Sequence, residues 1–579
     1  MLDDIEKLST EDLIELRLQL KSEIRADSWD RFCSYNLQDV AIPLKLDKKK
    51  NLFAVQMMLA YRAKINYESA LGPVALWTAI IHNELMSHNI VLPPRSRASK
   101  SEAYEGAYVK DTIPGFYNWV TCFDFTSLYP TLMASHCISP ESLVRSYDEI
   151  PVPVRKYWRT NITQHMRDNS LPAEVSEALL ANHMCICGNG EVFRTDVDAV
   201  IPRLVRNMFA DRKSAKDEMK TLKRKYEADH TLTELKDAAE LLSVKEQVIK
   251  ICLNSLYGAF GSEHFHLFEV ALAAAITISG QGYILHCQDE FNKYLRKICN
   301  EPERDFVIAG DTDSLYLYLG LFQEKFGMNQ AQLTKAIDTK FQDLAAQYIK
   351  DVVDMTGVTR SMMGLKREKI ISVSVFIRKK RYVGYAVDNE GVVYAEPQFF
   401  VVGLESKRSD VPRKVRSSLE DVYKLILAND EQGLIEYVSN FRQNYHTYPL
   451  DTIAFATGVS NVAKWQNQSK SGVPYKSGTP IFVRAAIMHN YLVSELDLER
   501  NIQPITNGTK IKYVYLDPKN PTRENVIGFT GATIPTEFDL TKYIDYDLMF
   551  EKTFISPVKT ICEVAGMLYE PASEASGYF

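Results

Sequence analysis

The chain has 579 residues, too many for one hydrophobic core, so we expect roughly two to four subdomains. Hydrophobic residues make up 46 % and charged residues 25 %, as in an ordinary globular protein, and no run of about 18 apolar residues predicts a membrane span. The net charge of −6 excludes a protein that is basic over its whole surface, but it leaves room for a local basic face that binds nucleic acid.

The N-terminus is acidic and lacks the apolar core of a signal peptide. Nine cysteines are scattered without a disulfide framework, which indicates a reducing compartment. Cys185 and Cys187 form a close pair, but no second pair lies nearby in the sequence, so the spacing does not favour a zinc site.

The first hundred residues predict helices. The polar residues at 9–12 can cap a helix that begins at Leu13 and carries residues 35–40. Residues 51–95 have the pattern of an amphipathic helix. Two prolines and a polar run at 93–101 then mark a boundary.

A strand and a helical hairpin follow. Residues 119–125 are apolar and rich in β-forming types, so we place Asp124 near the end of a strand that Pro130 terminates. Residues 203–258 contain little Gly or Pro and predict two helices in a hairpin.

Two more carboxylates lie in a predicted β-turn-β unit. Residues 306–309 and 314–319 predict short strands, and the connection between them contains Asp311 and Asp313. Their period-2 spacing can place both on one side of the hairpin tip, where Asp124 can join them from another strand end. Carboxylates from separate strands can hold Mg²⁺. An isolated Asp-Thr-Asp is more often a solvated turn than a metal site. The metal site is therefore inferred only because the other segments accompany it.

Basic or polar residues lie along one face of each helix of the predicted hairpin. The two sets are Arg212, Lys216 and Lys220 on the first helix, and Lys250, Asn254 and Tyr257 on the second. Spacings of three and four residues place each set on one helical face. If the faces meet, they surround a substrate with several negative charges, because forked Arg donors and Lys point charges both suit phosphate. The alternative is a solvated, charged hairpin.

The segments after the carboxylates are rich in strand formers. Residues 370–385 and 392–404 predict strands. Lys379–Tyr382 is expected on a strand, with Lys380 and Tyr382 on one face. Helices are expected to return from about residue 405.

Three segments resemble motifs A, B and C of the family B DNA polymerases, and within that family the replicative polymerases of large tailed bacteriophages. They are Asp124–Pro130, Lys250–Gly258 and Gly310–Ser314. The resemblance implies an α+β fold shaped like a right hand, with a palm of antiparallel sheet plus helices, helical-hairpin fingers and a mainly helical thumb. It implies a DNA-templated DNA polymerase that extends a primer 3′-hydroxyl with deoxynucleoside triphosphates by a two-metal mechanism and releases pyrophosphate.

The same resemblance divides the chain. It implies a remnant of the 3′–5′ exonuclease domain (1–50), a helical connector (51–95), a first palm segment (96–198), fingers (199–262), a second palm segment (263–404) and a thumb (405–579).

The resemblance also implies a site for two Mg²⁺ ions, for which Mn²⁺ can substitute. Asp124, Asp313 and the backbone of Phe125 would bind the metals, Asp311 would support them, and Glu368 is a further carboxylate nearby. Lys250 would act in catalysis. The implied nucleotide-binding residues are Ser127, Leu128, Tyr129, Arg212, Lys216, Lys250, Asn254 and Tyr257. Within this set, Tyr129 would exclude a 2′-hydroxyl, although a buried structural Tyr is the alternative reading of it.

Other implied contacts are with primer–template DNA. The implied DNA-binding residues are Tyr104, Gly106, Gly258, Thr312, Lys379, Lys380, Arg381 and Tyr382. The sequence departs from the family at Ala309, where a Tyr usually precedes Gly-Asp-Thr-Asp, so packing near the primer terminus is expected to differ.

Tyr35 and Asp39 match the last of the three exonuclease motifs, and the first two would lie before residue 1. We therefore expect no proofreading by this chain alone, and a separate exonuclease-bearing subunit as partner. The C-terminal Gly577–Phe579 weakly resembles tails that dock a sliding clamp, with a frayed terminus as the alternative. The resemblance places a phage-encoded enzyme in the cytoplasm of a bacterial host, with no membrane partner.

Two other functions compete with this reading. A non-catalytic DNA-binding scaffold would be expected to have lost Asp124, Asp313 or Lys250, and all three are present. An RNA-templated polymerase shares acidic motifs, but the Lys250–Gly258 and Lys379–Tyr382 segments disfavour it. Primer extension on DNA and RNA templates, with Asp313→Ala as control, separates the three.

Overall fold

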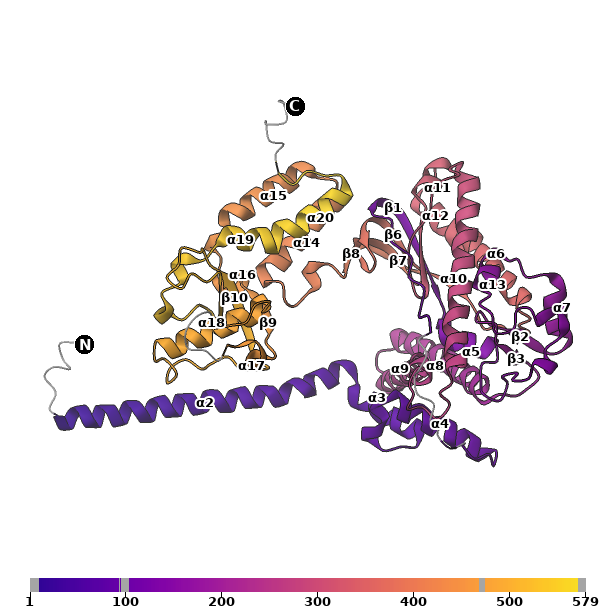
Figure 1. Ribbon diagram of the computed structural model, residues 1–579, viewed down its shortest axis with the longest axis horizontal. Helices are drawn as coiled ribbons and strands as arrows, with labels where there is room; N and C mark the ends of the chain where they lie inside the picture. Colours follow the sequence, from indigo (N-terminus) through magenta and orange to yellow (C-terminus); the bar gives the residue numbers. More distant parts are fainter. Residues whose placement is uncertain (1–9, 93, 95–103, 468–473, 571–579) are drawn as a thin grey trace, which may run out of the picture.

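The computed structural model describes residues 10–92, 94, 104–467 and 474–570. In Figure 1 a large sheet lies beside a helical hairpin, a C-terminal lobe lies to one side, and a long N-terminal helix extends beneath that lobe. Helices and antiparallel strands are both abundant, so the predicted α+β class holds. The predicted boundary at 93–101 and the segment Gly577–Phe579 lie outside the described residues, apart from Pro94.

The N-terminal helices are α2 (Thr10–Lys50), α3 (Leu52–Ala63) and α4 (Pro73–Ser87), with a short 3₁₀ turn at Tyr67–Leu71. The helical character predicted over 51–95 is present, but it is divided between α3, the 3₁₀ turn and α4. Lys64 ends α3 in the left-handed conformation, and Gly72 followed by Pro73 starts a new helix, because Pro suits a first helical position.

A six-stranded antiparallel sheet forms the centre, in the order β4-β5-β1-β6-β7-β8. Its strands are β1 (Gly115–Phe125), β4 (Val307–Asp311), β5 (Ser314–Tyr318), β6 (Leu365–Arg378), β7 (Arg381–Asn389) and β8 (Val392–Val402). The expected strands are all present. However, β1 ends before Pro130, which lies in the first turn of α5 (Leu128–Ser135), so Pro130 does not end the strand.

One face of this sheet is covered by α10 (Val270–Cys299) and α13 (Gln342–Met355). Phe123 of β1 packs on Phe291 of α10 with ring centroids 5.5 Å apart. Among the described helices, α10 is long and apolar enough to cross a membrane, but 78 % of its apolar window is buried in the protein. It is therefore a core helix of this fold.

The helical hairpin consists of α8 (Val200–Ala228) and α9 (Thr233–Phe260), as predicted. It leaves the sheet after β1 and returns before β4. The indole N–H of Trp77 on α4 donates to the carbonyl of Cys252 at 3.0 Å, which fixes the N-terminal helices against α9.

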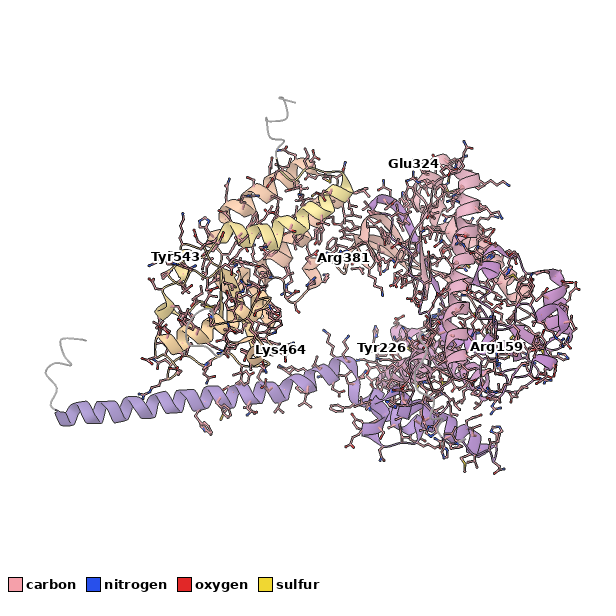
Figure 2. The ribbon with its side chains drawn as sticks, in the orientation of Figure 1. Arg159, Tyr226, Glu324, Arg381, Lys464 and Tyr543 are labelled. Atoms are coloured by element: carbon pink, nitrogen blue, oxygen red, sulfur yellow. The ribbon has the colours of Figure 1, made fainter. Side chains whose placement is uncertain are left out.

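The C-terminal lobe contains α14 (Arg413–Leu427), α15 (Glu431–Asn444), α18 (Ile481–Glu495) and α20 (Ser556–Ala565). It also contains a three-stranded sheet of β9 (Phe455–Gly458), β10 (Lys510–Tyr515) and β11 (Val526–Phe529). This sheet was not predicted from the sequence, which indicated a mainly helical segment from residue 405. Arg381, labelled in Figure 2 at the junction with the main sheet, pairs with Glu405.

The remaining helices and strands are short. They are α6 (Thr163–Asp168), α7 (Ala173–Ala181), β2 (Met184–Ile186), β3 (Val192–Arg194), α11 (Gly320–Lys325), α12 (Gln330–Ala336), α16 (Leu450–Ile453), α17 (Val462–Trp465) and α19 (Tyr546–Phe550). Cys185 on β2 and Cys187 just after it are buried free thiols, and burial raises the pKa of both.

Candidate active site

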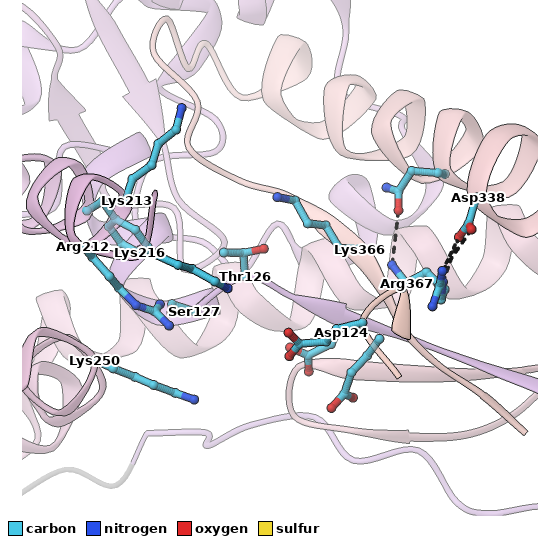
Figure 3. A pocket seen from close by; sticks show the side chains of 15 residues that line it. Asp124, Thr126, Ser127, Arg212, Lys213, Lys216, Lys250, Asp338, Lys366 and Arg367 are labelled. Atoms are coloured by element: carbon cyan, nitrogen blue, oxygen red, sulfur yellow. Dashed lines mark hydrogen bonds and ion pairs between the residues drawn. The ribbon is translucent and has the colours of Figure 1, made fainter. Parts of the chain in front are cut away.

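A pocket of about 680 Å³ lies between the central strands and the helical hairpin (Figure 3). It is lined by Asp124, Thr126, Ser127, Phe209, Arg212, Lys213, Lys216, Lys250, Asp338, Gln342, Lys366, Arg367, Glu368, Glu390 and Gly391. Acidic groups come mainly from the sheet and basic groups mainly from the hairpin. The pocket therefore has the charge pattern of a site for a metal-bound polyanion.

Strand pairing brings Asp124 next to Asp313. Asp124 lies opposite Ser314 on β5, and the backbone N–H of Phe125 donates to the carbonyl of Asp313 at 2.8 Å. Burial raises the pKa of Asp124 to about 7, with further contributions from the charges of Asp313 and Glu368. The pKa of Asp313 is raised by burial and then by Asp311. The carboxylates predicted from separate segments thus lie close together.

A β-bulge directs Glu368 into this group. Cys122 lies opposite Lys369, and Phe123 lies opposite Arg367, so Glu368 has no partner on β1. Such an extra residue bends the strand and redirects its side chain, and bulges are common beside active sites. The Cys122 thiol donates to the Glu368 carboxylate at 3.5 Å.

Glu390 is an acidic residue of the pocket that the sequence patterns did not identify. It lies in the β7–β8 turn with φ 50°, and its N–H donates to the carbonyl of Glu368 at 2.6 Å. Its charge also raises the pKa of Asp124.

The donors suit a hard divalent cation. Desolvated carboxylates repel one another, and Mg²⁺ relieves that repulsion while taking oxygen ligands. Within the described ranges, no group of three or more His, Cys, Asp or Glu converges tightly enough to hold a metal by itself. Mg²⁺ commonly takes only some of its oxygen ligands from protein carboxylates and the rest from water and substrate.

The wall opposite the carboxylates is basic. Arg212, Lys213 and Lys216 of α8 and Lys250 of α9 line the pocket (Figure 3). The Arg212 guanidinium is held by Glu246 of α9, with Nε 2.7 Å and Nη2 2.6 Å from Oε1. The charge of Lys250 lowers the pKa of Asp124, which places this ammonium near the carboxylates.

Two of the hairpin residues predicted to bind the substrate, Lys220 and Asn254, do not line this pocket. Lys220 is one turn beyond Lys216 and is not among the residues that line the pocket. Asn254 lies with Lys250 on a neighbouring groove of about 730 Å³ along α9. Lys213 was not predicted, although it is four residues after Phe209 and therefore on the same helical face.

The N-terminus of α5 forms another edge of the pocket. Ser127 has φ 49° and precedes the helix, so the first amide groups of α5, including that of Leu128, have no partner within the helix. Such an end favours a bound anion. Tyr129, in the first turn, packs on Tyr257 with ring centroids 4.6 Å apart.

Tyr129 is close to the carboxylates and tightly confined. Burial and the charge of Asp313 raise its pKa to about 12. A Cβ on Gly280 of α10 would lie 3.3 Å from the Tyr129 ring, so only glycine leaves this space open without a shift. The Tyr257 hydroxyl lies 3.5 Å from that of Tyr104.

Four of the predicted DNA-binding residues lie at the turn between β6 and β7 or at the start of β7. They are Lys379, Lys380, Arg381 and Tyr382. Lys379 and Lys380 form the turn between β6 and β7, with φ 59° at Lys380, so their predicted position on a strand is wrong. Lys380 Nζ lies 3.3 Å from the Asp311 carboxylate, and the Tyr382 and Tyr316 hydroxyls are 2.9 Å apart. The turn is therefore beside the turn that contains Thr312, which has φ 50°.

Two other predicted DNA contacts are placed by α9 and α10. The carbonyl of Gly106 accepts from Gln281 of α10 at 2.7 Å. A Cβ on Gly258 of α9 would meet nothing within 4 Å. Ala309 stands where the resembled family usually has a Tyr. It lies opposite Tyr316 on β5, so the neighbouring strand places an aromatic residue beside this position.

An ion-pair network fixes the strand that carries the pocket's sheet residues. Arg367 pairs with Asp388, and both side chains are nearly inaccessible to solvent. Arg367 Nη2 also lies 2.7 Å from Asp338, and Asp388 accepts the N–H of Gly391 at 3.0 Å. The network therefore joins β6 to the β7–β8 turn, and both line the pocket.

Known proteins share this chain's sequence over most of its length. A family profile described as "DNA polymerase family B" matches residues 75–565. The chain is 27 % identical to the "DNA-directed DNA polymerase" of Enterobacteria phage T4 over 95 % of this chain and 65 % of that protein. The values are the same for Escherichia phage RB69. For the "DNA polymerase" of Paramecium bursaria Chlorella virus NY2A, identity is 24 % over 98 % of this chain and 55 % of that protein. The chain thus spans about two thirds or less of these relatives.

Proposed function

Because the chain belongs to DNA polymerase family B, we propose that it extends a primer 3′-hydroxyl with deoxynucleoside triphosphates on a DNA template and releases pyrophosphate. The observation that carries the proposal is one pocket with Asp124 on its sheet side and Arg212, Lys216 and Lys250 on its helical side. The register that places Asp313 beside Asp124 supports the same reading.

The fold supports an assignment of the chain to polymerase subdomains. The sheet is built from residues before and after the helical hairpin, so 96–198 and 263–404 are assigned as one palm. The hairpin, within 199–262, is assigned as fingers, and residues from 405 as thumb. The N-terminal residues 1–50 and 51–95 are assigned as exonuclease remnant and connector.

In the proposed reaction, Asp124, Asp313 and the Phe125 carbonyl would hold two Mg²⁺, or Mn²⁺. The metals would favour loss of the 3′-hydroxyl proton and neutralise the charge of the leaving pyrophosphate. Arg212, kept in position by Glu246, binds the triphosphate with fixed donors. The free amides at the start of α5 donate to the phosphates. These groups orient the α-phosphate towards the primer end.

Primer extension tests this function. Extension with deoxynucleotides on a DNA template, absent on an RNA template of the same sequence and absent in Asp313→Ala, is the expected result. Extension mainly on RNA would favour the RNA-templated class. Duplex binding without extension by the unaltered chain would favour a DNA-binding scaffold.

Tyr129→Ala is expected to raise the use of ribonucleotides relative to deoxynucleotides by tenfold or more. The Tyr129 ring is confined by Tyr257 and Gly280, so it cannot move aside for a 2′-hydroxyl, and a steric clash worth about 1.4 kcal/mol corresponds to tenfold. The measurement is the ratio of kcat/KM for the two nucleotides. Tyr129→Phe keeps the ring and should keep the ratio. An unchanged ratio in Tyr129→Ala would make Tyr129 a packing residue.

Primer–template DNA is assigned to the corner that contains Tyr104, Gly106, Gly258, Thr312 and Lys379–Tyr382. Lys380 lies beside Asp311, and Gly258 leaves open space on α9, so DNA can approach both. A duplex bound by such backbone contacts is held without sequence choice. The phage names of two relatives support assignment to the cytoplasm of an infected bacterial cell.

A separate exonuclease-bearing subunit is assigned to α2, where the large side chains Trp29, Leu37 and Val40 are 65 %, 72 % and 61 % exposed. Tyr35 and Asp39 are also exposed on this helix. The purified chain is expected not to degrade a mismatched primer end. Degradation that survives Asp313→Ala but is lost in Asp39→Ala would contradict this. A sliding clamp, docked through residues outside the described ranges, is a further proposed partner.

A further inference from the structure

Lys366 is a cation on the acidic side of the pocket that the proposed reaction does not yet use. It lies on β6 directly opposite Asp124 of β1, and its exposed side chain lines the pocket. Cross-strand neighbours point to the same face of a sheet, so the strand pairing itself directs Lys366 towards the site. Within the described stretches of the chain, its ammonium makes no hydrogen bond or ion pair.

Among the described residues, no carboxylate forms an ion pair with the Lys366 ammonium, including that of Asp124 on the paired strand. Arg367, the next residue, forms ion pairs with both Asp388 and Asp338. Glu368 accepts from Cys122 at 3.5 Å. An ammonium left unpaired in a pocket that also contains carboxylates is available to an anion that enters the pocket.

The position of Lys366 indicates which portion of an anion it would meet. In Figure 3 the Lys366 ammonium extends from the sheet towards the cations of α8 and away from Asp124, which lies lower in this view. The reacting phosphate has to lie next to the carboxylates, because the metals act there. The end of the triphosphate remote from the reaction therefore reaches Lys366.

We propose that Lys366 binds the outermost phosphate of the incoming nucleotide, and after reaction the pyrophosphate that contains it, from the palm side. This inference rests on the proposed function and adds a second wall to the triphosphate site. The α8 cations hold the triphosphate from one side, and Lys366 holds it from the other. Because substrate and product share this phosphate, the same contact serves the forward and reverse reactions.

Lys366→Ala is expected to raise the KM for deoxynucleoside triphosphate about tenfold, which corresponds to about 1.4 kcal/mol of binding. The KM for inorganic pyrophosphate in the reverse reaction should rise similarly. A contact made equally in ground and transition states changes KM and leaves kcat nearly constant. Lys366→Arg keeps a cation and should recover most of the affinity.

The matched control is Lys325→Ala, which removes one exposed lysine from α11 and touches neither the pocket nor the proposed DNA corner. It should leave both KM values and primer–template affinity unchanged. A second probe is the deoxynucleoside diphosphate, which lacks the outermost phosphate. Its inhibition constant should change much less in Lys366→Ala than the KM for the triphosphate.

Three outcomes would overturn the inference. An unchanged KM would make Lys366 a solvated lysine, an equal loss for the diphosphate would place it elsewhere on the nucleotide, and a loss of primer–template affinity would place it on a DNA surface. If the unaltered chain extends no primer, the proposed function fails separately. Calorimetric titration of wild type and Lys366→Ala with pyrophosphate and Mg²⁺ then decides the inference by itself, with weaker binding by the variant in its favour and equal binding against it.

Discussion

Asp124→Ala or Asp313→Ala is expected to reduce primer extension at least a hundredfold, because each removes a proposed ligand of the metals that would stabilise charge in the transition state. Primer–template affinity should remain nearly unchanged, since both carboxylates are partly buried at a strand end rather than on a basic surface. The measurements are single-nucleotide extension rates and the dissociation constant of a labelled duplex. Near-normal turnover in either variant would remove that residue from the metal site.

Two further readouts separate lost chemistry from lost folding. Asp354→Ala, which removes an exposed carboxylate paired with Lys350 on α13, should retain full activity. When no metal is added, the free energy of unfolding of Asp124→Asn should be at least as large as that of the wild type. The folded-state pKa of Asp124 is raised to about 7, so the folded state binds the proton more tightly and wild-type stability falls as pH rises towards 7. The advantage of the Asn variant over wild type should therefore grow between about pH 4 and 7.

Lys250→Ala is expected to lower kcat/KM for the incoming nucleotide by about a hundredfold or more, the scale of a lost preorganised charge. The charge of Lys250 lowers the pKa of Asp124, so this ammonium lies near the carboxylate beside which the proposed reaction would occur. Its effect should exceed that of Lys366→Ala, because developing charge is concentrated there. Nucleotide-dependent extension rates at several concentrations measure kcat and KM separately.

Lys245→Ala provides the matched control for Lys250, since it removes an exposed lysine from the same helix without changing the pocket lining. It should behave as wild type. If Lys250→Ala mainly weakened primer–template binding instead, α9 would present Lys250 to the duplex and the assignment of the pocket to the triphosphate would be wrong.

Order and spacing along the chain anticipated much of the site. Asp124 at a strand end and Asp313 after a hairpin turn were predicted from local patterns, and strand pairing brings them together. Helical periodicity predicted that Arg212 and Lys216 share a face. Such features depend on local spacing, which a sequence contains directly.

Features that depend on pairing between distant strands were not predictable. The bulge that redirects Glu368 exists because β6 has one more residue than β1 at that point, and no residue type marks it. Lys366 enters the pocket through its register with Asp124. Lys380 takes a left-handed conformation in a turn that lacks the usual Gly or Asn, so a strand was the natural expectation. The short strands β9 and β11 have four residues each, too few for a periodic signal.

The position of β1 in the middle of the sheet has a consequence for synthesis on the ribosome. Its partners β5 and β6 begin at Ser314 and Leu365, so roughly 190 residues or more are translated after β1 before either can pair with it. At about 5–20 residues per second, an apolar strand waits at least about ten seconds with both edges open. The α8–α9 hairpin can form locally during that time, since helical contacts close quickly. We therefore expect a helical intermediate with a late-forming sheet, and nascent chains arrested before β6 that depend on chaperones to stay unaggregated.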